Sequence, residues 1–304
     1  MNVSDLSPKE LRKRLTGPGL FLRTASFVTH LQSPIRSVAD GLTLLYADYP
    51  LLDDGGYADF HVRVAPPANL RRWIHPQVFF FLDGRSPFKP LPFDQAPAMF
   101  EWGLNYCVSN HCHQYLIVHA AVVERQGRAM IFPAPPGSGK STLCAGLVSR
   151  GWRLLSDELT LVRLRDGQVD PFPRPVSLKN ESIDIIRHFA PRAVIGPLVR
   201  DTTKGEVAHL KPPADSVARA GEAAQPAWVI FPQYKRGESP QLLPIPRARA
   251  FMRVAENTFN YSLLGAKGFE ALAQFMDSTD CFEFSYGQLE EAIALLAALP
   301  PSGH

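Results

Sequence analysis

Apolar and polar positions follow a strand pattern through the first third of the chain. Between residues 20 and 92, residues 57–64 alternate strictly, and residues 77–84 form a continuous apolar run closed by a turn. Residues 96–112 change to helical spacing, with Met99 and Trp102 among the large side chains. This change predicts a domain boundary near residue 95.

The remaining pattern interleaves strands with helices. Residues 115–124 and 129–134 are predicted strands joined by a hairpin turn, and residues 140–150 are a predicted helix that ends at Gly151. The later expected elements are a strand pair or one long bent strand over 152–164 with a hairpin at Asp166-Gly167, a buried strand over 228–234, and helices over 247–259, 267–279 and 287–299. This order predicts an α/β fold whose sheet is mixed rather than purely parallel.

The length of the chain favours two domains. At 304 residues the chain is long enough for about two domains. We therefore expect a smaller α+β N-terminal region over 1–95 and a nucleotide-binding domain over 96–304.

Composition and charge exclude several classes of function. The net charge of +3 is too small for a nucleic-acid surface, and no apolar run reaches the length of a membrane span. The polar N-terminus has no apolar segment of the kind that follows the charged start of a secretory signal. Four cysteines in a chain of this length do not resemble a disulfide framework. We expect a cytoplasmic protein with neither nucleic acid nor membrane as partner.

The strongest chemical motif is "PAPPGSGKST" at residues 133–142. A phosphate-binding loop works because successive backbone N–H groups point inward and the following helix presents its positive end. The expected nucleotide-binding residues are Pro136, Gly137, Ser138, Gly139, Lys140, Ser141 and Thr142. Lys140 can reach the β- and γ-phosphates, and the Ser141 hydroxyl can bind Mg²⁺. ATP and Mg²⁺ are the predicted cofactors.

Two features of this loop are unusual. Ala134 stands where the loop's first glycine is expected, and two prolines follow it. The prolines remove donors only early in the loop, and Ala134 is tolerated if its φ is negative. A Gly/Ser turn before a helix is the alternative interpretation, but an apolar strand enters the loop and a helix leaves it, which favours nucleotide binding.

The first acidic residues after the next buried strand are Asp157 and Glu158, in "WRLLSDELTL". A carboxylate beside a phosphate loop can organise a metal ion or accept a proton. Neighbours on a regular strand face opposite sides, so we expect Asp157 to face the nucleotide unless the strand bulges. A solvated strand start remains an alternative.

His119 is a second candidate partner of the loop. If Glu124 and Arg128 flank the hairpin turn, the antiparallel register sets His119 opposite Pro133, at the mouth of the loop. The alternative is a packed core histidine.

These residues together resemble a known family. "HAAVVERQGRAMIFPAPPGSGKSTL", "GWRLLSDEL", "RPVSLKNES" and "DTTKGEVAHL" are similar to the catalytic domain of HPr kinase/phosphorylase, and more closely to the bacterial group called HprK-related kinase A. The resemblance covers most of the chain. It departs from the family at Ala120 and Ala134, which replace glycines, and at Glu158, which replaces an aspartate.

The resemblance implies a P-loop-containing nucleotide-binding domain like those of phosphoenolpyruvate carboxykinase and HPr kinase. It also implies phosphate transfer to a serine hydroxyl on a protein or peptide. The residue matching Asp157 is a general base in that family, and the one matching His119 supports the site. With Ser141, we therefore expect Asp157 and Glu158 as metal ligands.

Two further stretches are predicted to be active-site loops. "RPVSLKNES" offers Arg174 and Lys179 before a helix that starts near residue 180, and "DTTKGEV" offers Lys204 in a tight turn. Either could supply a cation to a transferring phosphoryl group. We expect Lys179 to be catalytic, and solvated surface lysines are the alternative.

A zinc site is the competing interpretation of another cluster. Cys107 and His111 could share a helix face, but no second, separated ligand pair follows. Packed helix residues are the better interpretation.

The sequence therefore predicts an ATP- and Mg²⁺-dependent serine kinase acting on a peptide or small protein, and it leaves a homo-oligomer open. The alternatives are a small-molecule kinase of the same fold and a nucleotide-gated binding module with little turnover.

Overall fold

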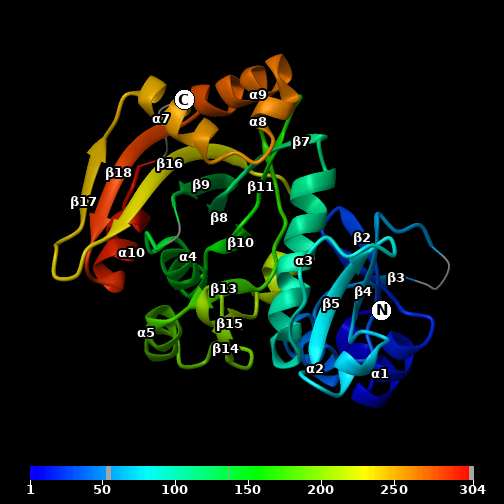
Figure 1. The fold of residues 1–304 in the computed structure, drawn as a ribbon. Helices are drawn as coiled ribbons and strands as arrows, with labels where there is room; N and C mark the ends of the chain where they lie inside the picture. The colour runs from blue at the N-terminus through cyan, green and yellow to red at the C-terminus, as the bar shows by residue number, and fades with distance from the viewer. Residues whose placement is uncertain (53–55, 136, 301–304) are drawn as a thin grey trace.

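The computed structural model describes residues 1–52, 56–135 and 137–300. Its ribbon falls into an N-terminal part and a larger part that carries the phosphate loop, with helix α3 running between them (Figure 1). Strands and helices interleave, so the predicted mixed α/β class is confirmed at that level.

The N-terminal part is a six-stranded sheet of order β3-β1-β2-β4-β5-β6. Its strands are β1 (Leu20–Thr24), β2 (Phe27–Gln32), β3 (Leu51–Leu52), β4 (Phe60–Ala65), β5 (Gln77–Leu82) and β6 (Leu91–Pro92). Its helices are α1 (Pro8–Thr16) and α2 (Arg36–Leu45). Strands β4 and β5 match the predicted runs, whereas α2 lies inside a stretch that the pattern marked as strand-like.

Helix α3 (Ala96–His111) follows this sheet, as predicted, and packs into its core. Met99, Phe100 and Leu104 are buried with the side chains of β4 and β5. Gly103 approaches the sheet so closely that a Cβ there would lie 2.0 Å from the ring of Phe80. Helix α3 therefore shares the core of the part that precedes it. The boundary at residue 95 stays a prediction.

The second part is built on another six-stranded sheet, of order β10-β8-β9-β16-β18-β17. Its strands are β8 (Ala120–Arg125), β9 (Arg128–Pro133), β10 (Arg153–Ser156), β16 (Gln225–Tyr234), β17 (Gln241–Pro244) and β18 (Asp280–Tyr286). β9, β16 and β18 run parallel and the other pairings are antiparallel, so the sheet is mixed as expected. Strand β18 was missed from the sequence.

Alternate residues of the central strands enter different cores. Val123 and Phe132 pack with α4 (Lys140–Ser149) on one face, while Val122 and Ile131 pack under α7 and α9 on the other. Side chains that alternate between two cores are expected in a sheet that is covered on both faces. The helices that cover the two faces are α5 (Glu181–Phe189), α7 (Arg247–Glu256), α8 (Tyr261–Leu264), α9 (Ala266–Asp277) and α10 (Leu289–Ala297).

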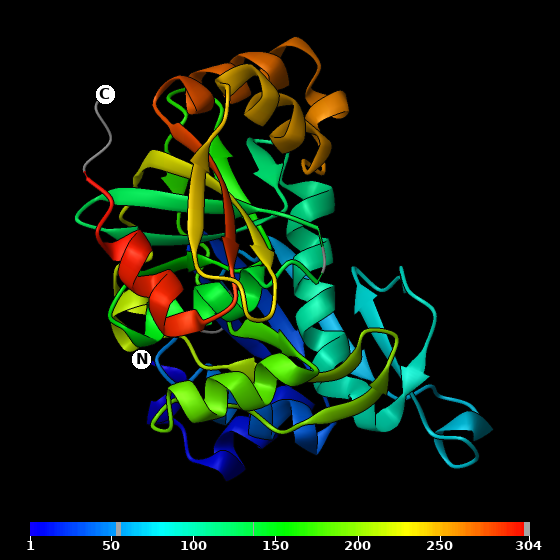
Figure 2. The same ribbon diagram turned by 90° about the vertical axis from the view of Figure 1, so that its left-hand side faces the viewer.

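Two small sheets complete the second part. One contains β7 (Tyr115–Val118), β11 (Thr160–Arg163) and β12 (Val169–Asp170), and the other contains β13 (Val176–Lys179), β14 (Val199–Thr202) and β15 (Gly205–Leu210), while the short helix α6 (Ala214–Ala218) follows them. Figure 2 looks onto the β17 edge of the large sheet, with α10 lying beside it.

Candidate active site

The phosphate loop joins the end of β9 to the start of α4. Gly137 and Gly139 have φ values of 86° and 89°, in the left-handed region that only glycine adopts readily. Ala134 is not among the residues with positive φ, so the expectation that its side chain is tolerated there is confirmed. Pro136, an expected member of the loop, lies outside the described residues.

Two tyrosines at the ends of parallel strands support this loop. The Tyr286 hydroxyl donates to the Gly139 carbonyl over 3.1 Å, and the Tyr234 amide donates to the Ser138 carbonyl over 3.0 Å. A Cβ on Gly139 would lie 2.4 Å from the Tyr286 hydroxyl oxygen, so the position admits only glycine on space as well as on φ. Sequence analysis missed both tyrosines, although the carboxyl ends of parallel strands are where such sites form.

Lys140 is the buried cation of the loop. Its side chain folds back so that Nζ donates to the Ala134 carbonyl over 3.2 Å, and the residue is 6% exposed. Burial lowers the pKa of Lys140, and the negative charges of Glu158 and Asp157 oppose that shift. Ser141 and Thr142 occupy the first turn of α4, both half-buried.

The carboxylates lie where strand structure is interrupted. β10 ends at Ser156 and β11 begins at Thr160, so Asp157 and Glu158 occupy a bend rather than a regular strand. On a regular strand only one of two neighbouring side chains would face the loop, but a bend does not impose this alternation. The charges of both Asp157 and Glu158 act on Lys140.

Asp157 and Glu158 have opposite environments. Asp157 is 4% exposed, its Oδ2 accepts from the Ser177 amide over 2.9 Å, and burial followed by repulsion from Glu158 raises its pKa to about 6. Glu158 is also penalised by burial, but a hydrogen bond from His119 and the charges of Lys179 and Lys140 lower its pKa below the ordinary value. Of the pair, Asp157 is therefore the better proton acceptor near neutral pH.

Glu158 joins two residues that the sequence singled out. Its carboxylate lies 3.3 Å from Lys179 Nζ and 3.4 Å from His119 Nε2. The structure thus brings Lys179, His119 and the acidic pair together beside Lys140. Their catalytic roles stay predictions.

His119 reaches this position by a route that differs from the expected register. The hairpin turn contains two residues, Gln126 and Gly127, so Arg125 rather than Glu124 pairs with Arg128, and Ala120 rather than His119 lies opposite Pro133. The predicted register was wrong by one residue. His119 lies in the bend between β7 and β8, where its ring stacks on Phe259 with centroids 5.4 Å apart.

Lys179 and Lys204 are carried by the β13–β15 sheet. Lys179 ends β13, and Asn180, with φ of 51°, starts α5 close to the expected residue. Lys204 precedes Gly205 in the turn between β14 and β15, and its Nζ lies 5.1 Å above the Trp102 ring of α3. Burial lowers the pKa of Lys204, and the charge of Glu158 opposes the shift, so the lysine lies within electrostatic reach of the site.

Arg174, from the same predicted active-site stretch, does not supply a free cation. Its guanidinium is buried and pairs with the Glu101 carboxylate of α3, and it donates to Asn105 Oδ1 over 2.8 Å. The expectation of Arg174 as a free active-site cation is therefore replaced by a structural ion pair, because its guanidinium is already matched by buried acceptors.

The oxygen donors fit the expected metal. Ser141, Asp157 and Glu158 offer a hydroxyl and two carboxylates, which are hard ligands of the type Mg²⁺ prefers. Mg²⁺ is held in kinase sites by few protein groups together with substrate phosphates. The described part of the chain contains no group of three or more His, Cys, Asp or Glu side chains arranged to bind a metal.

The cysteine–histidine cluster is divided between core and surface. Cys107 and Cys112 are buried among the apolar side chains of the N-terminal core, whereas His111 is exposed at the end of α3. The packed interpretation is confirmed for the two cysteines.

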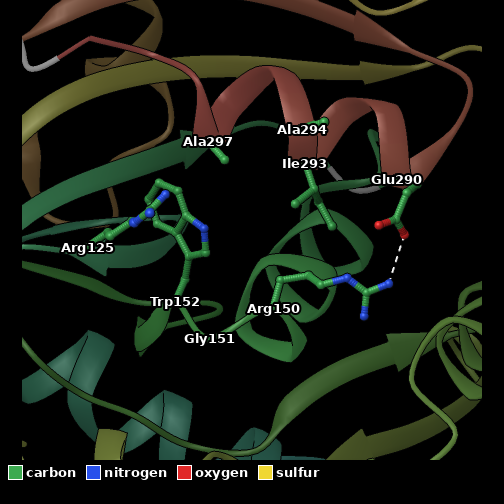
Figure 3. Close-up of a pocket in the computed structure, with 8 residues that line it drawn as sticks. All are labelled: Arg125, Arg150, Gly151, Trp152, Glu290, Ile293, Ala294 and Ala297. Atoms are coloured by element: carbon green, nitrogen blue, oxygen red, sulfur yellow. Dashed lines mark hydrogen bonds and ion pairs between the residues drawn. The ribbon is translucent and has the colours of Figure 1, made fainter.

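A separate hollow lies away from the phosphate site. Its volume is about 350 Å³, and it is lined by side chains such as Arg150, Trp152 and Ile293 between α10 and the end of α4 (Figure 3). Arg150 follows the last turn of α4 and pairs with Glu290 over 2.8 Å, at the opposite end of the helix from Lys140. This hollow is therefore not part of the phosphate site.

Comparison with known proteins finds distant relatives of the kinase class named above. A family model described as "SynChlorMet cassette protein ScmC" matches residues 98–239. The HPr kinase/phosphorylases of Lacticaseibacillus casei and Lacticaseibacillus paracasei are each 26% identical over 187 residues, covering 57% of this chain and 53% of the relative. The chain thus spans about half the length of the curated relatives it matches, and its similarity to HPr kinase/phosphorylase is distant.

The solved structures that match include one at low overall similarity. The Hpr(Ser) kinase/phosphatase of Coxiella burnetii is 11% identical, with 60% of this chain and 91% of that chain covered and a TM-score of 0.26. A score this low carries no argument about function.

None of the helices formed by the described residues combines the length and apolarity that crossing a bilayer requires.

Proposed function

We propose that this chain is an ATP- and Mg²⁺-dependent kinase that transfers the γ-phosphate to the hydroxyl of a serine in a peptide or small protein. The observation that carries the proposal is the convergence of Lys140, Asp157 and Glu158 beside a loop with two left-handed glycines. The distant similarity to HPr kinase/phosphorylase supports it.

The loop binds and orients the nucleotide. The backbone N–H groups after Gly137 and the N-terminus of α4 attract the phosphates, and the Lys140 ammonium neutralises their charge. Mg²⁺, held by Ser141 and the carboxylates, supplies further charge neutralisation when bound.

Asp157 is the group suited to accept the acceptor's proton. It is buried and has a raised pKa, so it exchanges a proton near neutral pH more readily than an exposed aspartate. Glu158 has a lowered pKa, so it remains charged and holds Lys179 and His119 in place. Lys179 and Lys204 stabilise charge on the transferring group.

A peptide acceptor is supported by the apolar rim of the site. Phe259, which stacks on His119, is 52% exposed, and Leu263 on the adjacent helix α8 is 68% exposed. Exposed apolar side chains beside a polar site suit residues that flank an acceptor serine better than they suit a small polar metabolite.

The test compares wild type with Asp157→Asn, which keeps the size of the side chain and removes its basicity. Nucleotide titration should find Mg-ATP affinity within about tenfold, while transfer of radiolabelled γ-phosphate to candidate peptides should fall by roughly two to four orders of magnitude. Equal transfer by both proteins would remove Asp157 as the base.

Two other results identify the alternatives. Labelling of small hydroxylated compounds and no peptide would indicate a small-molecule kinase. If wild type binds Mg-ATP and labels no acceptor, while nucleotide alters partner binding, the chain is a nucleotide-gated module.

A further inference from the structure

A small cavity lies behind the acidic bend, against helix α3. Its volume is about 20 Å³, enough for one water-sized group, and its walls include Asp157, Ser177, His209, Trp102 and Asn105. Strand β13 supplies Ser177 and its partner strand β15 supplies His209, directly opposite in the register.

Two oxygens that belong to this wall have no hydrogen-bond partner among the residues that the structure describes. They are Asp157 Oδ1 and Ser177 Oγ, and each belongs to a residue that is more than nine-tenths buried. A buried polar oxygen without a partner is rare in folded proteins, and leaving one unpaired is costly. A hydrogen-bond donor inside the cavity would satisfy both oxygens.

Arg174 and the second carboxylate oxygen of Asp157 already have hydrogen-bond partners. Arg174 uses its guanidinium on the Glu101 carboxylate, the Glu101 carbonyl and Asn105 Oδ1. The Asp157 Oδ2 atom is held by the Ser177 amide over 2.9 Å. The backbone amide of Ser177 thus already holds one oxygen of Asp157, and its side chain lines the same cavity as the other.

Resting on the proposed function, we propose that this cavity binds a single hydroxyl oxygen shared by Asp157 Oδ1 and Ser177 Oγ, and that Ser177 is a positioning residue for Asp157. The oxygen belongs either to an ordered water or to the acceptor's hydroxyl group, and both donate the hydrogen bond that Oδ1 lacks. If the oxygen is the acceptor's hydroxyl, the acceptor side of the reaction lies against α3, where Trp102 and Asn105 line the cavity.

The first test is independent of activity. A high-resolution crystal structure of the full chain should contain an ordered oxygen within hydrogen-bond distance of both atoms. Ser177→Ala should lower the melting temperature, because it removes a satisfied bridge. A dry cavity, or a melting temperature that is unchanged or raised on removing Ser177 Oγ, would overturn the proposal.

The second test uses transfer kinetics. Ser177→Ala should leave Mg-ATP affinity within about twofold and lower kcat by about tenfold or more, while Ser177→Thr, which keeps the hydroxyl on a strand that tolerates branching, should retain most of the rate. A rise in the acceptor's KM would identify the oxygen as the acceptor's hydroxyl, and an unchanged KM would identify it as water. An unchanged kcat, or equal losses in the two variants, would overturn the role of Ser177.

Ser33→Ala is the matched control. Ser33 is also buried, but its hydroxyl donates to the Val64 carbonyl over 2.7 Å in the N-terminal part. This variant should lose stability and keep the kinetic constants of wild type. If wild type transfers no phosphate at all, the proposed function fails, but the crystallographic oxygen and the melting temperatures still test the cavity.

Discussion

The chain buries charge in two regions that share one segment, residues 172–179, and the two are built differently. At the α3 junction, Arg174 and Glu101 pair with each other, and both Glu101 oxygens accept from the Tyr46 hydroxyl, at 2.9 and 3.0 Å. At the phosphate loop, Asp157 Oδ1, Ser138 Oγ and Ser177 Oγ lack a partner within the described residues.

This difference separates charges that hold the fold from charges that await a ligand. At the junction, burial disfavours the charge of Arg174, but Tyr46 and Glu101 outweigh it and raise the arginine's pKa. At the loop, burial dominates and lowers the pKa of Lys140. Perturbed and incompletely paired groups are typical of functional sites, whereas fully paired buried ions are typical of structural ones.

The largest expected effect breaks the loop. Lys140→Ala should abolish phosphoryl transfer and weaken Mg-ATP binding by more than about 2 kcal/mol, because a desolvated ammonium–phosphate contact is lost. Calorimetry measures the affinity, and transfer of radiolabelled γ-phosphate measures the activity. Lys211→Ala, which removes a pair with Asp48 at 2.7 Å, should leave ATP binding unchanged. Unchanged affinity in Lys140→Ala would disprove the assignment of the loop.

The next effect breaks the junction. Arg174→Ala should destabilise the protein by about 3–5 kcal/mol, because Glu101 is left buried without its counter-ion. Chemical denaturation measures the loss, and Mg-ATP affinity of the folded variant should stay near that of wild type. The double variant Arg174→Met with Glu101→Gln should recover much of the stability. A single variant as stable as wild type would show that the pair does not hold the junction.

A smaller effect exposes the energetic cost of the Asp157 charge. Its folded-state pKa of about 6 lies above the ordinary 3.8, so the folded chain retains a proton that the unfolded chain has released between these values. Folding stability contributed by this group therefore falls as the pH rises from about 4 to about 6, and the full penalty remains above that.

Asp157→Asn should remove this penalty. Without nucleotide, the variant should match wild type near pH 4 and be more stable by about 3 kcal/mol near pH 7.5, as judged from urea unfolding at both pH values. Asp184→Asn, on a side chain that is 72% exposed, should show no such dependence. A stability difference between wild type and Asp157→Asn that does not change with pH would contradict the assigned cause.

The smallest effect compares two buried tyrosines, one in each region. Tyr286→Phe removes the bond to the Gly139 carbonyl, and Tyr49→Phe removes a bond of 2.7 Å to the Pro173 carbonyl. Each should cost about 0.5–1.5 kcal/mol of folding stability. Only Tyr286→Phe should also weaken ATP binding, by a few-fold in titration. Equal ATP affinities in the two variants would mean that Tyr286 does not position the loop.

Local sequence was sufficient to predict the phosphate loop and most elements around it. Gly137 and Gly139 take the left-handed conformation that their lack of Cβ permits, and α4 begins at Lys140 as expected. These features depend on neighbours in the chain, so short patterns reveal them. The alternative of a strand pair over 152–164 is confirmed, with Asp157 and Glu158 in the bend between β10 and β11.

Tertiary structure decided which residues of the predicted stretches meet. The sequence by itself determined that Lys140, Asp157, His119 and Lys179 carry the candidate chemistry. It did not determine that Arg174 turns toward Glu101, that Ser177 holds Asp157, or that Tyr286 holds Gly139. The partners in these contacts are separated by 73, 20 and 147 residues along the chain, and a local pattern holds no information on pairings of that range. They arise because packing of the sheets and α3 fixes which buried polar groups lie close enough to satisfy one another.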